Sequence, residues 1–350
     1  MMTIDPLRDV EDRDAERGLA LSGFCKSGCH VLLLAISVLS GSLSVFAAEE
    51  AFVTNEKDNT ISVIDVATSE VVRKIATGSR PRGIVAAPDG SMIYVCASDA
   101  NRIDFIDPLT GVIAASINDI PDPELIAVSP DGHFLYATNE EDNALSVIDV
   151  GARKVVSVID VGVEPEGVAV SPGGHLVVVT SETTNMLHVV NAGTRQLLDN
   201  VLVGSRPRYA QFTPDGTKIW VSSEIGGTIA ILDTASRRIV KEVRFEVAGI
   251  RGEQIQPVGI RFSPDGSRAY VALGPANRVA VVDTATGKVI KYVLVGVRVW
   301  HLALSKDGGK LFTTNGGSND VTIIDTNRLT ATKTLTVGRQ PWGVATLQRK

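Results

Sequence analysis

The sequence predicts an all-β protein, a seven-bladed β-propeller of four-stranded antiparallel blades that is closed by one split blade. Three sequence markers recur with a period of 42 residues, interrupted by a single interval of 50 residues. One is a pair of apolar residues followed by Asp or Asn, one is a turn of the Pro-Asp-Gly type, and one is a proline. The Asp or Asn positions are 65, 107, 149, 191, 233, 283 and 325, and the prolines are at 81, 123, 165, 207, 257 and 341, with Val299 in the remaining copy. Self-similarity at this period, without the 3.6-residue pattern of helices, is typical of a propeller.

Each repeat contains four short segments rich in β-branched residues. In the first complete copy we expect strands at Gly83–Ala87, Met92–Ser98, Arg102–Asp107 and Val112–Ile117. The first two are joined by a Pro-Asp-Gly turn, in which glycine supplies the positive φ that a tight turn requires. Four strands in about 40 to 50 residues make one propeller blade.

The two ends of the repeat region complete each other. Ala51–Asn55 aligns with the second strand of a repeat, whereas Gly343–Gln348 supplies only a first strand. Joined, they form a seventh blade, and their pairing removes two free sheet edges. We therefore expect residues 48–350 to form a single propeller domain.

The residues before the propeller predict export. Residues 31–46 are uncharged and rich in Leu, Val and Ser, and Ala47 offers a signal-peptidase site. Residues 1–47 are thus interpreted as an N-terminal extension and signal peptide, with a periplasmic mature protein that has no membrane span. The first residues are acidic where a signal is normally basic, so a translation start near Lys26 or an uncleaved anchor are alternatives. Cleavage leaves Cys96 as the one cysteine, which excludes a disulfide framework.

The net charge and the motifs of the sequence argue against two classes of ligand, nucleic acids and structural metals. The net charge is −6 and the pI is about 5.5, which argues against neutralisation of nucleic-acid phosphates. Cys25, Cys29 and His30 are similar to a haem c attachment motif, but the cysteines have one residue too many between them and lie before the apolar segment. No HExxH motif or EF-hand spacing occurs in the sequence, so we predict no structural metal.

Candidate binding residues flank the recurrent proline, because the links between blades converge at one mouth of the central channel. They differ from copy to copy, which a purely structural repeat does not require. The candidates are Arg80, Arg82, Glu124, Glu164, Glu166, Arg206, Arg208, Arg298, Trp300, His301 and Trp342. Guanidinium groups suit carboxylate or phosphate, tryptophan rings can stack on a planar ligand, and His301 adds a titratable ring. Pairing of Arg with Glu across blades is the alternative interpretation.

One insertion lies on the same face. Between Asp233 and Pro257 the chain gains eight residues, which we interpret either as a lid over the mouth or as a neutral length variant.

Strand motifs carry a resemblance to a known family. The tetrapeptides that begin at Phe52, Tyr136 and Phe312 end in Thr-Asn, and they alternate with VID-type strands and SPDG-type turns. This pattern resembles the YVTN-repeat β-propeller family, and within it the exported propellers associated with PQQ-dependent alcohol oxidation in proteobacteria. The resemblance implies a periplasmic, non-enzymatic accessory protein, with a quinoprotein dehydrogenase or a small anionic ligand as partner and PQQ as a candidate ligand. We expect a monomer.

Two functions follow from these observations and remain open at the level of sequence. The first is a binding or scaffolding propeller. The second is a hydrolase of the lactonase type that uses mouth carboxylates such as Glu124, Glu164 and Glu166. No catalytic triad can be singled out, because its candidates recur in every blade.

Overall fold

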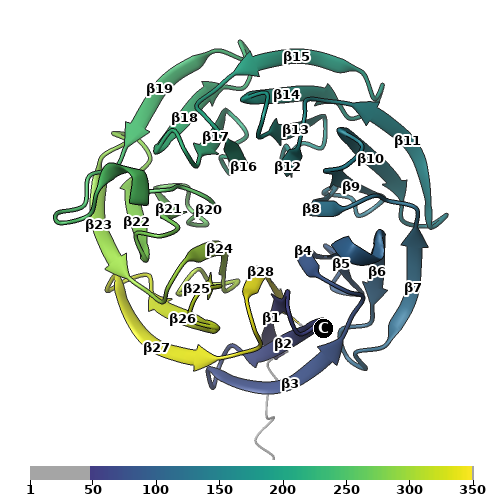
Figure 1. Ribbon diagram of the computed structural model, residues 1–350, viewed down its shortest axis with the longest axis horizontal. Coiled ribbons are helices and arrows are strands. Elements are labelled where there is room, and N and C mark those ends of the chain that lie inside the picture. The colour runs from purple at the N-terminus through teal and green to yellow at the C-terminus, as the bar shows by residue number, and fades with distance from the viewer. Residues whose placement is uncertain (1–47, 349–350) are drawn as a thin grey trace, which may run out of the picture. The chain divides into compact units, whose positions relative to one another are not determined.

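The computed structural model describes residues 48–348, which form seven four-stranded antiparallel sheets around a central axis (Figure 1). The chain divides into two units, Met1–Ser44 and Val45–Lys350, and the description concerns only the second. The predicted signal peptide therefore lies outside the described residues. The predicted fold class is confirmed.

Every blade has the same order from the central axis outward. The inner strands are β4 (Pro81–Ala86), β8 (Pro123–Val128), β12 (Pro165–Val170), β16 (Pro207–Phe212), β20 (Ile260–Phe262), β24 (Val299–Leu304) and β28 (Pro341–Gln348). The second strands are β5 (Ile93–Ala97), β9 (Phe134–Asn139), β13 (Leu176–Ser181), β17 (Lys218–Ser223), β21 (Arg268–Ala272), β25 (Lys310–Asn315) and β1 (Glu49–Asn55). We number the blades 1 to 7 in this order.

The third and fourth strands continue each blade to its rim. The third strands are β6 (Arg102–Ile106), β10 (Ala144–Asp149), β14 (Met186–Asn191), β18 (Thr228–Asp233), β22 (Arg278–Asp283), β26 (Asp320–Asp325) and β2 (Thr60–Asp65). The outer strands are β7 (Ile113–Asn118), β11 (Lys154–Asp160), β15 (Leu197–Leu202), β19 (Ile239–Arg244), β23 (Val289–Leu294), β27 (Thr330–Thr336) and β3 (Glu70–Ala76). Two 3-10 turns, Ser98–Ala100 and Gly252–Gln254, complete the secondary structure of the described residues. No helix between residues 48 and 348 is long and apolar enough to cross a membrane.

Blade 7 is the split blade that the sequence predicts. β28 pairs antiparallel with β1, with Glu50 opposite Leu347 and Val53 opposite Val344, and β2 and β3 extend the sheet outward. The C-terminal strand lies beside the N-terminal strand in Figure 1. Closure of the ring thus depends on backbone hydrogen bonds between the two ends of the propeller.

Burial explains the composition of the strands. The second and third strands are covered on both faces by neighbouring blades, as in β1, where all residues after the first are buried. Such strands contain nearly continuous apolar residues. In the outer strand β3, exposed residues instead alternate with half-buried ones and with buried Ile75, because only one of its faces contacts protein. Apolar contacts between blades therefore form the core.

The Pro-Asp-Gly turns form through side-chain bonds from their aspartates. Asp131 Oδ1 accepts hydrogen bonds from the Ser129 hydroxyl at 2.5 Å and from the His133 amide at 3.0 Å. Gly132 adopts a φ of +76°, which is a left-handed conformation that favours glycine. The predicted turn chemistry is confirmed, and His133 is an exposed turn residue.

A threonine hydroxyl connects neighbouring blades through their inner strands. In blade 2, Thr138 Oγ1 accepts from the Leu125 amide at 3.0 Å and donates to the Glu166 carbonyl of blade 3 at 2.8 Å. The same pair of bonds recurs at Thr54, which links blade 7 to blade 1, and at Thr314, which links blade 6 to blade 7. We call this arrangement the hydroxyl relay. It explains the recurrent threonine of the Thr-Asn motif.

Blade 5 achieves the same connection without a hydroxyl. Ala272 occupies the position of the threonine, and the Gly259 amide donates directly to the Trp300 carbonyl of blade 6 at 3.0 Å. The distance between blades is therefore set by a hydrogen bond in either case.

Replacing Thr138 with valine should destabilise the propeller by about 2 kcal/mol or more. The shape is retained, but the Leu125 amide and the Glu166 carbonyl lose their partner in a buried place, at about 1–3 kcal/mol each. Urea unfolding measures the loss. The matched change Thr330→Val on exposed β27 should alter stability by no more than about 0.5 kcal/mol. Equal effects of the two changes would contradict the role of the relay.

Candidate functional site

The mouth residues before the recurrent proline are positioned by asparagine side chains. Asn185 Oδ1 accepts the Arg206 amide at 2.8 Å, and Asn277 Oδ1 accepts the Arg298 amide at 2.9 Å. Arg206 and Arg298 themselves have a φ of +56°, and the asparagines are also left-handed. The Asn-rich loops thus form turns that hold the backbone of each mouth residue in place, and this role explains their recurrent asparagines.

The structure adds a third set of residues to the two sets that flank the proline. These residues follow the second strand of each blade and face the mouth from its outer side. They are Glu56, Ser98, Glu140, Glu182, Glu224, Gly274 and Gly316, again at intervals of 42 residues with one of 50. Sequence reasoning missed this set, although the repeat alignment contains it.

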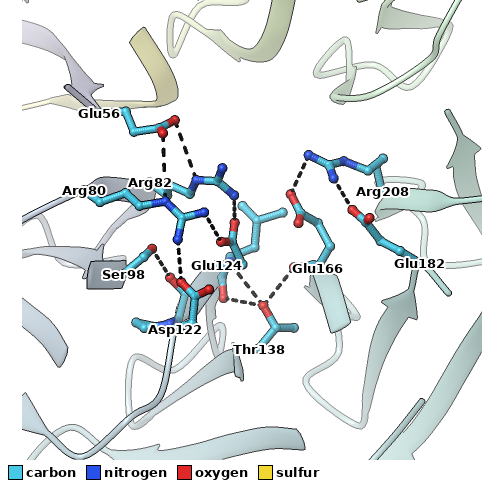
Figure 2. A network of polar contacts seen from close by, with 12 residues as sticks. Glu56, Arg80, Arg82, Ser98, Asp122, Glu124, Thr138, Glu166, Glu182 and Arg208 are labelled. Carbon is cyan, nitrogen blue, oxygen red and sulfur yellow. Dashed lines mark hydrogen bonds and ion pairs between the residues drawn. The ribbon is translucent and has the colours of Figure 1, made fainter. Parts of the chain in front are cut away.

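Arginines and carboxylates from the three sets lie together at the mouth, and all of them except Glu140 form ion pairs across blades. We call this group the mouth network, and part of it is shown in Figure 2. It consists of Glu56, Arg80, Arg82, Asp122, Glu124, Glu140, Glu166, Glu182, Arg206, Arg208, Glu224 and Arg298.

The first half of the mouth network is centred on Glu124. This carboxylate is fully buried and accepts bonds from Arg82 Nη1 and, at 3.2 Å, from Arg80 Nη2. Arg80 also contacts Asp122 at 2.9 Å, and Arg82 lies 3.7 Å from Glu56 (Figure 2). Both guanidinium groups therefore already bind carboxylates of the chain.

The second half is centred on Arg208, whose side chain is 7% exposed. Its guanidinium contacts Glu166 of blade 3 at 3.2 Å and donates to Glu182. Arg206, whose side chain is 47% exposed, contacts Glu182 at 2.7 Å and Glu224 at 3.4 Å. Burial lowers the pKa of Arg208, but the surrounding glutamates outweigh this effect and raise it above its ordinary value. Arg208 is therefore permanently charged.

Arg298 and Trp300 extend the network across blade 5. Arg298 of blade 6 contacts Glu224 of blade 4 at 2.7 Å, and its guanidinium carbon lies 4.2 Å from the centroid of Trp300. The Arg208 guanidinium also lies over this ring, at 5.6 Å. Blade 5 itself offers the apolar Val258 and Gly274. Most charged residues of the mouth thus come from blades 1 to 4, whereas Trp300 and Trp342 come from blades 6 and 7.

The predicted site residues are brought together, with one exception. Glu164 is exposed and bonds the Thr183 hydroxyl away from the other carboxylates. The arginines are paired across blades, which is the alternative that the sequence left open. Trp342 is 1% exposed and lies between Arg82, at 5.2 Å from its ring, and His301, at 4.3 Å between centroids. Its ring therefore has no exposed face for a planar ligand.

Three acids of the mouth network lie close enough to share an ion. Carboxylate oxygens of Asp122, Glu124 and Glu140 lie within 4.8 Å of one another. However, Arg80 contacts the first two acids, and Arg82 contacts Glu124. This cluster is therefore compensated by arginine, and we treat it as part of the network.

Below the mouth network lies a cavity that occupies the central channel. Its volume is about 230 Å³, and residues of all seven inner strands line it. Its polar lining consists of Tyr209, Gln211, Arg261 and His301, and the rest is mainly aliphatic. We call it the channel cavity.

Arg261 is a site residue that sequence reasoning missed. Its Nη1 donates to Tyr209 Oη, to Gln211 Oε1 at 3.0 Å and to the Ile260 carbonyl at 2.9 Å. Within residues 48–348 no carboxylate oxygen of Asp or Glu lies within 4.0 Å of the Arg261 guanidinium nitrogens, which is the limit for an ion pair. The repeat alignment does single it out, because the equivalent residues are Val85, Ala127, Ala169, Gln211, Ala303 and Ala345.

His301 lines the same cavity and is neutral at physiological pH. It is 3% exposed, and burial together with Arg261, Arg208 and Arg82 holds its pKa well below the usual range. Its Nε2 atom is buried without a hydrogen-bond partner among the described residues, as is Nε1 of Trp342. His188, by contrast, has partners on both ring nitrogens and is a structural residue.

The insertion packs on blade 5. Val247 and Ile250 contact the hydrophobic core, and the Glu246 amide donates to the Tyr292 hydroxyl of β23 at 3.1 Å. Arg251 and Glu253 are exposed and lie 3.2 Å apart. These contacts attach the insertion to its own blade at several points.

The comparisons with known proteins agree with a propeller. The sequence model described as YNCE-like beta-propeller matches residues 15–143, of which the described part contains β1 to β9. A search of curated proteins gave no match.

Solved structures share the fold at low sequence identity. Hydrazine synthase of Kuenenia stuttgartiensis has a TM-score of 0.72 at 22% identity, over 79% of this chain and 92% of that one. The periplasmic gluconolactonase PpgL of Pseudomonas aeruginosa has a TM-score of 0.73 at 18% identity, over 87% and 100%. A putative 6-phosphogluconolactonase of Bacteroides fragilis has a TM-score of 0.72 at 18% identity, over 86% and 98%. The protein is therefore a seven-bladed β-propeller, and at these identities the likeness concerns the fold alone.

Removal of Arg208 should cost far more stability than removal of its neighbour. Arg208→Ala leaves buried Glu166 and Glu182 without their main cation, and breaking a buried pair in this way costs about 3–5 kcal/mol. Arg206→Ala should cost about 1 kcal/mol or less, because Arg206 is half exposed and its acids keep Arg208 and Arg298. Denaturant unfolding of both variants tests this. Similar losses would mean that the buried pairs do not carry the stability of the mouth.

The free energy of unfolding of the propeller should fall as pH rises, because folding raises the pKa of Glu140. Burial and the neighbouring Glu124 raise this pKa from 4.5 to about 8. Between these values the folded state holds a proton that the unfolded state has lost, so stability falls as pH increases.

Glu140→Gln mimics the protonated carboxyl and should flatten this dependence. The variant should gain stability over the parent between pH 5 and pH 8.5, with the difference growing across that range. Urea unfolding at several pH values measures it. Parallel curves for the two proteins would show that Glu140 titrates normally.

Proposed function

We propose that the protein is an exported, non-catalytic propeller that binds a small molecule in the channel cavity. The observation that carries the proposal is a cavity of about 230 Å³ at the centre of the ring, with polar atoms that the fold does not use. Concave, mostly apolar sites with a few convergent polar groups are the usual form of small-molecule sites.

The mouth network supports binding within the channel and not at the mouth. Its five arginines face seven carboxylates, and Glu124, Glu166 and Arg208 are nearly inaccessible to water. Solvent therefore does not enter through these residues. At the opposite end of the inner strands, Val128 and Val170 are half-buried, which supports entry from the side of the Pro-Asp-Gly turns.

Export and an accessory role in PQQ-dependent alcohol oxidation are part of the proposal. They are supported by the apolar segment before Ala47 and by the resemblance of the repeats. PQQ itself is a poor match for the channel cavity, since it carries three carboxylates on a rigid three-ring body and the cavity offers one guanidinium free of carboxylates. A periplasmic quinoprotein dehydrogenase remains the partner that this context favours.

A lactonase-type hydrolase is the second candidate, favoured by the similarity in fold to proteins described as gluconolactonases. Its mouth carboxylates would need to act on water or substrate. Glu124 and Glu166 instead lie buried in ion pairs with Arg82, Arg80 and Arg208. The binding function therefore fits the geometry better.

Thermal unfolding of the purified protein should distinguish the two functions. A small molecule that binds the folded state at a hundred times its Kd stabilises it by about 2.7 kcal/mol. We expect such a shift with small carboxylates and no hydrolysis of gluconolactone above the uncatalysed rate. Lactone hydrolysis that is abolished by Glu124→Gln in a folded variant would overturn the proposal in favour of the hydrolase.

A further inference from the structure

The polar atoms of the channel cavity carry an inference about the chemistry of its ligand, which rests on the proposed binding function. Three neighbouring blades contribute them: Tyr209 and Gln211 lie on β16 of blade 4, Arg261 on β20 of blade 5, and His301 on β24 of blade 6. The four residues occupy two positions of the repeat, and most other copies hold glycine, alanine or valine at these positions. The polar group is thus a local departure from an otherwise apolar channel.

Arg261 gives this group a positive charge that no carboxylate among residues 48–348 pairs with. All its hydrogen bonds within the described residues use Nη1, and their acceptors are a phenol, an amide and a backbone carbonyl. No other residue of the described propeller bonds Nε or Nη2, which together form one edge of the guanidinium with two parallel N–H groups. A half-buried cation without a counterion favours an anion that supplies one.

His301 adds a second polar atom to the same wall. Its ring lies between Tyr209, at 5.5 Å between centroids, and Trp342, at 4.3 Å. The ring is nine-tenths buried or more, and its Nε2 has no partner within residues 48–348. A buried polar atom without a hydrogen bond costs free energy that a ligand can recover.

We propose that Arg261, His301, Tyr209 and Gln211 form a binding site for a small monocarboxylate in the channel cavity. One guanidinium offsets one negative charge, which favours a monocarboxylate over a phosphate dianion or a polycarboxylate. The aliphatic lining, which includes Leu125, Val128 and Val170, contacts the body of the ligand. At about 30 Å³ for each water, the cavity holds the equivalent of roughly eight waters, so the ligand is the size of a short-chain acid.

Isothermal titration of the full chain with matched acids and amides tests the charge requirement. The probes are butyrate, lactate and benzoate, each beside its amide, with inorganic phosphate and PQQ as further arms. We expect at least one acid to bind and its amide to bind at least tenfold more weakly. Equal affinity for an acid and its amide, or tighter binding of phosphate, would overturn the site.

Variants then locate the binding. Arg261→Gln should weaken the best acid at least tenfold, whereas Arg261→Lys should retain part of the affinity because it keeps the charge. Arg328→Gln, at an 81% exposed side chain, is the matched control and should leave affinity unchanged. Thermal unfolding without ligand establishes that each variant is folded.

The outcomes separate this inference from the proposed function. Binding of an acid that is unaffected by Arg261→Gln overturns the assignment of the site, while a binding function elsewhere in the protein survives. If none of the acids binds and gluconolactone is hydrolysed, both proposals fail. Acid binding that depends on Arg261, without lactone hydrolysis, supports both.

Discussion

The distance between neighbouring inner strands is held by a buried hydrogen bond, and both the closed ring and its site depend on that distance. In blades 2, 6 and 7 a threonine hydroxyl accepts an amide of its own blade and donates to a carbonyl of the next. In blade 5 a backbone amide makes the contact directly. The carbonyls that accept these bonds belong to Arg82, Glu166, Trp300 and Trp342, so the bonds that join the blades also fix the height of the mouth residues.

The mouth network is a consequence of placing charged residues at these fixed heights. Glu124 and Arg208 are desolvated, and burying them is favourable only because each meets more than one opposite charge. The two tryptophans also stabilise these charges, because cation–π contacts place Arg208 and Arg298 over Trp300 and Arg82 over Trp342. The network thus places buried ion pairs across one mouth of the channel, and these pairs connect blades that are not joined by a disulfide in the described propeller.

The mouth network and the channel cavity differ in the groups that their arginines contact. Each arginine of the mouth network forms ion pairs with carboxylates, whereas the hydrogen bonds of Arg261, which lines the channel cavity, go only to neutral acceptors. Arginine is therefore paired differently at two depths of one channel. The difference is electrostatic. Glutamates compensate the positive charge of a mouth arginine, whereas Arg261 lies beside a phenol, an amide and a neutral imidazole, which do not compensate its charge.

Sequence alone determined the fold class, the blade count, the split blade and the face on which the blade links converge, because the 42-residue period and the turn residues are local and repeat seven times. It also located most of the mouth residues. Only the tertiary structure decided which charges pair, since Arg298 and Glu224 are 74 residues apart and meet across an intervening blade. The tertiary structure also places Arg261 and His301 in one cavity, whereas Arg80 does not line that cavity. Pairing depends on the angle and depth of each side chain in the closed ring, and neither quantity is encoded in spacing along the chain.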